Sequence, residues 1–137
     1  MDNTTDNTAF VPAPFNPADY EASDTGWLEV QSQSGDGPLL VNDRPVRFEL
    51  FGPGSREYLR VQHEQEIANQ AVAYATARGK ANKETLDDRI KKNSIRLTAL
   101  TRNIENFPIA AKDIYSNPKF GFIAAQVSRF IEDWANF

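Results

Sequence analysis

The stretch "VRFELFGPGSREYLRV", residues 46–61, contains the change of hydrophobic period that decides the fold. In its first part, Val46, Phe48 and Leu50 alternate with Arg47 and Glu49, which is the period of a strand with one buried face. The breakers "GPGS" follow, and apolar residues then recur at helical spacing. The stretch therefore predicts a strand, a short connection and a helix.

The alternating pattern extends upstream of this stretch. In "GWLEVQS", Leu28 and Val30 fall on one side of a strand, and Trp27 and Glu29 fall on the other. The segments "SGDGP" and "NDRP" are rich in turn residues and separate short apolar runs. We expect an antiparallel sheet of two or three strands over residues 27–51, which is too small to be stable without helices packed against it.

Helices are predicted downstream of the sheet. Ser55 is a good N-cap for a helix over residues 55–78, and Gly79 suits its C-terminus. The second half of this helix is alanine-rich, which favours close packing against another helix. A second helix is expected to begin near Asn82 and to end by Pro108, and "IAAKDIYS" predicts a short helical turn. The apolar stripe of the second helix consists of Leu86, Ile90, Leu97, Leu100 and Ile104.

The C-terminal stretch predicts a final amphipathic helix, with Asn117 as its N-cap and Pro118 at its first position. Its apolar face either packs against the sheet and the second helix or stays partly exposed for a partner protein. The second alternative makes this face a candidate protein-binding site. Its residues are Phe120, Ile123, Val127, Phe130, Ile131, Trp134 and the terminal Phe137.

The predicted fold class is α+β, with a small antiparallel sheet of two or three strands followed by a mainly helical bundle of three to four helices. Residues 1–25 form an acidic tail that contains prolines and no Lys or Arg, so we expect it to be disordered or extended. Alternatively, its apolar residues dock on the fold or on a partner. Residues 26–137 form a single domain, with a β-hairpin region at 26–52 and a helical region at 54–137.

Composition excludes several kinds of chemistry. The 137 residues fit one domain, and there is no cysteine and a single histidine, His63, so disulfides and cysteine- or histidine-rich metal sites are excluded. The adjacent Asp87 and Asp88 point in different directions on a helix, and "FGPGS" lacks the lysine of a phosphate loop. We expect no enzyme activity, cofactor or metal. No apolar run is long enough to span a membrane and no signal peptide is recognisable, so an intracellular protein is expected.

A basic stretch lies between Arg78 and Arg102, where eight Lys and Arg residues outnumber three acidic ones. It is interpreted as a solvated helix face, or alternatively as a surface for an acidic partner or for the acidic tail. A nucleic-acid-binding role would rest on the same residues. The absence of interleaved aromatic residues and the net charge of −4 argue against that role.

Three segments of the sequence carry a family resemblance. The first is a strand followed by the spacing of Gly52, Ser55 and Tyr58, and the second is "LTALTRNIENF". The third is a tyrosine before a short loop and a helix, at Tyr115, Gln126, Val127, Phe130, Ile131, Asp133, Asn136 and Phe137. Together they resemble the tail assembly chaperones of long-tailed bacteriophages, or a related small phage tail protein. The chain departs from the family at Ile104 and Phe107, where tryptophan and glycine are frequent, and in its acidic tail.

The resemblance implies a non-enzymatic protein that binds the tape measure protein and keeps it soluble in the host cytoplasm while the tail tube assembles. The tail tube protein is a further implied partner, and a homo-oligomer of the chain is a further alternative that the sequence leaves open. The alternative is a structural minor tail or connector protein of the virion, in which "VPAPFNPADY" would lie over a neighbouring subunit.

Overall fold

The structure is a computed structural model that describes residues 14–79 and 84–137. Its elements in chain order are η1 (Pro17–Tyr20), β1 (Thr25–Glu29), β2 (Leu40–Val41), β3 (Arg44–Pro45), β4 (Arg47–Phe51), α2 (Arg56–Ala77), α3 (Leu86–Ala99), β5 (Thr101–Glu105), α4 (Ala111–Tyr115), η2 (Pro118–Phe120), α5 (Gly121–Glu132) and η3 (Trp134–Asn136). The predicted α+β fold with a small antiparallel sheet is confirmed.

The main sheet has three antiparallel strands in the order β1-β4-β5, so β4 is its central strand. Val46, Phe48 and Leu50 are fully buried, as their alternation predicts. Strands β2 and β3 form a separate two-stranded hairpin. Its turn holds Asn42 and Asp43 at φ values of 52° and 62°, a left-handed conformation that these two residue types tolerate well.

The predicted helix through Ile104 is wrong at its C-terminal end, because α3 ends at Ala99 and residues 101–105 form β5. Ile104 pairs with Phe48 on the central strand. Without β5, one edge of β4 would expose unpaired backbone groups beside the core, which costs free energy. This pairing joins residues far apart in the sequence, so local periodicity does not reveal it. The predicted start of that helix at Asn82 lies outside the described residues.

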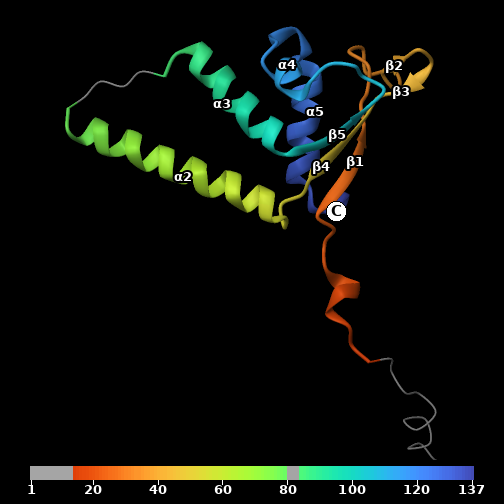
Figure 1. The fold of residues 1–137 in the computed structure, drawn as a ribbon, viewed down its shortest axis with the longest axis horizontal. Coiled ribbons are helices and arrows are strands. Elements are labelled where there is room, and N and C mark those ends of the chain that lie inside the picture. Colours follow the sequence, from red (N-terminus) through yellow and green to blue (C-terminus); the bar gives the residue numbers. More distant parts are fainter. Residues whose placement is uncertain (1–13, 80–83) are drawn as a thin grey trace, which may run out of the picture.

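Helix α2 begins where the sequence predicts. The Ser55 hydroxyl accepts a hydrogen bond from Tyr58 N (3.1 Å) and donates one to Gly52 O (2.7 Å). Gly79 follows the helix at φ 80°, as expected for a helix C-terminus. The expected packing of the alanine-rich half is wrong, because residues 62–77 are exposed except for the half-buried Ala75. Figure 1 shows α2 extending away from the sheet.

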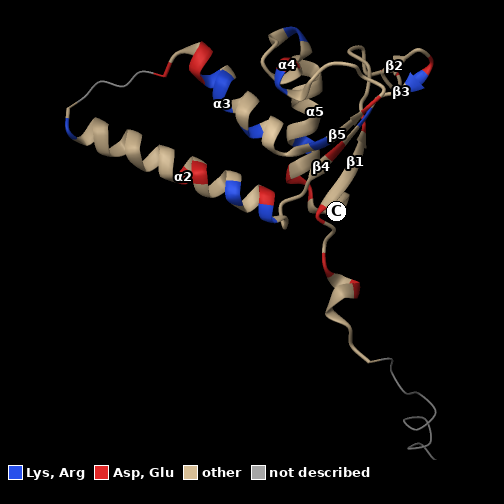
Figure 2. Cartoon of the chain, viewed as in Figure 1, with Lys and Arg blue, Asp and Glu red and all other residues tan. Residues whose placement is uncertain are grey.

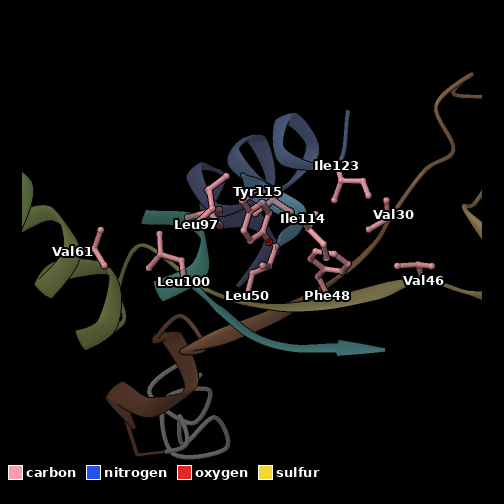
Figure 3. Packing of buried hydrophobic residues seen from close by; sticks show 12 residues of the cluster. Val30, Val46, Phe48, Leu50, Val61, Leu97, Leu100, Ile114, Tyr115 and Ile123 are labelled. Carbon is pink, nitrogen blue, oxygen red and sulfur yellow. The ribbon is translucent and has the colours of Figure 1, made fainter. Parts of the chain in front are cut away.

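The core lies between the sheet and the helices on one of its faces (Figures 1 and 3). The predicted short helix at "IAAKDIYS" is present as α4, which buries Ile114 and Tyr115. Tyr115 packs edge-on against Phe48, with 6.4 Å between ring centroids, and its hydroxyl lies 2.6 Å from Thr101 Oγ1. The buried position of this phenol raises its pKa.

The last helix begins as a 3₁₀ turn capped by Asn117, whose side chain accepts a hydrogen bond from Lys119 N. Helix α5 ends at Glu132, before Trp134, because Asp133 leaves the helical conformation and caps the separate turn η3. This turn brings the terminal Phe137 to the start of β1. Figure 1 places the C-terminus at that point.

The described part of the acidic tail is exposed from residue 14 to residue 24. Phe15 and Tyr20 stack on each other with 5.3 Å between ring centroids. Near the predicted boundary between residues 25 and 26, Ser23 N donates to Phe137 O (2.7 Å), and Gly52 N donates to Asp24 O (2.8 Å). Strand β1 then begins at Thr25, so the tail is joined to the domain by backbone contacts at residues 23–25.

Candidate protein-binding groove

The terminal helix is largely a core element. Ile123, Val127 and Ile131 have no exposed surface, so a partner cannot reach them in the folded chain. Three other predicted site residues, Phe120, Phe130 and Phe137, are half-buried. The rings of Phe130 and Phe137 contact each other edge-on (5.5 Å), and Phe120 packs in the same way against Phe107 (5.7 Å). Trp134 remains 59% exposed and is the predicted site residue that a partner contacts most easily.

A second apolar surface lies between α2 and α3, which run side by side away from the sheet in opposite chain directions (Figure 1). Val61, Ala68, Ile95 and Ala99 contribute apolar side chains to a groove of about 290 Å³ between these helices. Farther from the sheet, Val72 and Ile95 line a continuation of about 340 Å³. We call these two hollows together the α2–α3 groove.

Ile95 is the central apolar residue of the groove, and its position on α3 explains its exposure. Leu97 on α3 and Leu100 at the C-cap of this helix face the core and are fully buried. Ile95 lies two positions before Leu97, hence on nearly the opposite side of the helix, and is 62% exposed. The sequence contains this signal, since an isoleucine stands alone on the polar side of the predicted stripe. The sequence-based prediction of the site missed it.

Residues 67–77 of α2 carry no charged side chain, as the uncharged outer half of this helix in Figure 2 shows. Val72 is 37% exposed, and Ile67 and Tyr74, on the side of α2 away from α3, are 53% and 64% exposed. An exposed helix that is polar enough to be solvated usually carries charges. An uncharged, exposed helix with large apolar side chains is typical of an interaction surface.

Charged residues border the groove along α3 (Figure 2). Glu84 binds Lys92 (2.6 Å) and approaches Arg89 (3.6 Å), and Arg96 lies 3.8 Å from Glu132 of α5. These members of the basic stretch are therefore paired with acidic neighbours. The Glu84 pairs are exposed and contribute little to stability, so their main effect here is to keep the border of the groove solvated, whereas the Arg96 side chain is only 16% exposed.

The start of α3 is fixed by a capping box. Asp88 N donates to the Thr85 hydroxyl (3.1 Å), and Thr85 N donates to the Asp88 carboxylate (3.1 Å). These two hydrogen bonds lower the pKa of Asp88, and the one from the Thr85 backbone has the larger effect. The carboxylate is thus ionised at the N-terminus of α3, where the helix dipole favours a negative charge.

The described residues contain no cluster of three or more His, Cys, Asp or Glu side chains that could hold a metal ion. The Ser55 hydroxyl is engaged in the strand-to-helix turn, and His63 is exposed on α2. Within residues 14–79 and 84–137, no helix combines the length and the apolar character needed to cross a membrane.

Comparison of the chain with protein-family models, with curated proteins and with solved structures gives no match. The fold and the groove therefore define a small α+β protein with a candidate protein-binding surface.

Proposed function

We propose that this protein is a non-enzymatic tail assembly chaperone of a long-tailed bacteriophage, and that its client is the helical tape measure protein. The client is taken from the resemblance of the sequence segments. The structural observation that carries the proposal is the α2–α3 groove, with the exposed Ile95 on its floor. This groove replaces the terminal helix as the principal candidate surface.

The shape of the groove suits a helical client. One amphipathic helix laid between two others would bury its apolar residues against Val61, Val72 and Ile95 while its polar side faces water. Each fully buried aliphatic side chain contributes roughly 1.5–3 kcal/mol. A few such contacts give useful affinity, and the loss of a few lets the client leave when the tail tube polymerises around it.

The chaperone itself must remain soluble while it presents this surface. The charged border formed by Glu84, Lys92 and Arg96 keeps water close to the apolar floor. Trp134, at the end of the fold where α2 begins, offers a further aromatic contact to a long client. The arrangement fits a holding function, in which binding prevents aggregation of a long apolar helix.

A structural role in the virion is the second candidate, and the N-terminal arm favours it. Phe15 and Tyr20 are 75% and 77% exposed and are stacked together on a segment that extends away from the domain (Figure 1). A preformed aromatic pair of this kind would suit permanent attachment to a neighbouring subunit of a tail or connector.

The two roles differ in where the protein is found after assembly. The experiment is co-expression of the chain with the tape measure protein of the same phage, together with a quantitative analysis of purified particles. We expect the chain to raise the soluble fraction of the tape measure protein and to be absent from particles. Stoichiometric incorporation into particles, with no effect on the solubility of the tape measure protein, would establish the structural role instead.

A further inference from the structure

Strand β1 has an open backbone edge of defined length. Val30 N donates to Val46 O, and Gly52 N donates to Asp24 O, so the even-numbered residues of this segment bond toward β4. In an antiparallel ladder, the odd-numbered residues then direct their N–H and C=O groups away from the sheet. These outward residues are Thr25, Trp27 and Glu29. No other strand of the described chain pairs with them.

Both ends of this edge are closed by the protein itself. At one end, Phe137 O accepts the outward N–H of Ser23 (2.7 Å). At the other, the Gln126 amide binds both outward groups of Gln31, at 2.7 Å to N and 3.0 Å to O. Ser23 and Gln31 each lie four positions from Trp27. The open edge is therefore centred on Trp27, with a single 3.4 Å contact from the exposed Gln31 side chain to Glu29 O within it.

The opposite edge of the sheet differs. Strand β5 carries the charged Arg102 and Glu105 and is irregular in its register with β4. Charges and bulges are the usual means by which edge strands avoid pairing. Strand β1 has only Glu29 as a charged residue, so it is the edge better suited to pairing.

We propose that β1 pairs with β1 of a second copy of this chain, antiparallel and with Trp27 opposite Trp27 at the twofold axis. This register uses all three outward residues, because Thr25 of one copy then faces Glu29 of the other. A shift in either direction would place an open residue opposite the closed Ser23 or Gln31. The result is a continuous six-stranded sheet across two copies.

The groove beside this edge is complementary to itself under the same symmetry. A hollow of about 670 Å³ lies between β1 and α5, and Leu28, Phe122, Arg129 and Asp133 are among its lining residues. Leu28 of the second copy faces the same side of the sheet and enters this hollow. Arg129 lies in the last turn of α5, and Asp133, which follows the helix as its C-cap, carries the opposite charge. A twofold arrangement therefore sets the arginine of each copy near the aspartate of the other.

A cysteine trapping experiment tests both the partner and the register, because the chain has no cysteine of its own. Residues opposite each other as a hydrogen-bonded pair have Cα atoms about 5.5 Å apart, which suits a disulfide. We expect Trp27→Cys to form a covalent dimer under mild oxidation. The matched control Glu29→Cys should form far less, because two copies of residue 29 are separated along the strand in this register.

Sedimentation of the unlinked chain provides the second measurement. The Glu29 N–H points outward, so Glu29→Pro removes a bond of the dimer and none of the β1–β4 ladder. We expect a dimer for the unaltered chain and for Glu29→Ala, and a monomer with unchanged circular dichroism for Glu29→Pro. The proposal is overturned if the unaltered chain is monomeric at all concentrations, or if Trp27→Cys and Glu29→Cys link at equal rates.

Discussion

The ring of the terminal residue Phe137 packs directly on the backbone of Gly52, at the junction of β4 and α2. A Cβ atom built on Gly52 would lie 2.5 Å from Cδ1 of this ring. The same ring lies over Gly26 of β1 and edge-on to Phe130 of α5. The side chain of Phe137 thus contacts the sheet, the connection between β4 and α2, and the terminal helix.

Gly52→Ala should destabilise the fold, because the added methyl group forces Phe137 out of its position. Overpacking of this kind costs roughly 1–3 kcal/mol in the free energy of unfolding. Gly121→Ala is the matched control, since an added Cβ there meets no atom and alanine favours a helix. Urea unfolding measures both. Equal stabilities of the two variants would show that Phe137 does not occupy this position.

Truncation of the N-terminal tail should leave the thermal midpoint of unfolding unchanged until Ser23 is removed. We expect a chain without residues 1–21 to keep its thermal midpoint, since the described residues of that segment are exposed. Removal of residues 1–24 also deletes Ser23 N and Asp24 O, which bond to Phe137 and Gly52. Each such bond contributes about 1 kcal/mol, so the midpoint should fall by several degrees. Equal midpoints for both truncations would contradict these contacts.

The free energy of unfolding should fall at acid pH because Glu49 becomes protonated. Hydrogen bonds from Asn103 and Thr25, together with the charge of Arg102, hold the pKa of this carboxyl below its usual 4.5. A depressed pKa stabilises the fold fully above the unfolded-state pKa, and this contribution is lost as pH falls from about 4.5 through the folded-state pKa. Glu49→Gln should therefore flatten the decrease of the unfolding free energy with falling pH. An unchanged decrease would exclude Glu49 as its source.

Two aspartate substitutions in the terminal segment should distinguish a buried position from an exposed one. Ile131→Asp introduces a charge at a fully buried position, so we expect the chain to unfold. Trp134→Asp alters a side chain that is 59% exposed, so the far-ultraviolet circular dichroism should remain that of the folded chain. A folded Ile131→Asp variant would contradict the placement of α5 in the core.

The sequence predicts those parts of the fold that depend on neighbouring residues. The caps at Ser55 and Asn117 and the alternation through Phe48 are local signals, and the structure confirms them. Strand β5 was missed because its pairing with β4 spans more than fifty residues. Its Thr101 and Ile104 are β-branched, which suits a strand, but they also continue a helical spacing.

The candidate site is only partly visible in the sequence. The apolar periodicity of the terminal helix identifies a buried face, and periodicity alone does not distinguish a core from a binding surface. Ile95 and the uncharged residues 67–77 of α2 are the sequence features that mark the groove. These features indicate a binding surface only together with the structure, in which α2 and α3 extend from the sheet and few other residues cover them.

Capture of the tape measure protein by groove variants tests the central claim most directly. Ile95→Glu places a charge on the groove floor, and Leu86→Glu is the matched control at an α3 residue that is 73% exposed and does not line the groove. Both should fold normally. We predict that the unaltered chain and Leu86→Glu hold the co-expressed tape measure protein in solution. With Ile95→Glu, the amount of soluble tape measure protein that the chain captures should fall at least tenfold. Equal capture by all three would contradict binding in the α2–α3 groove.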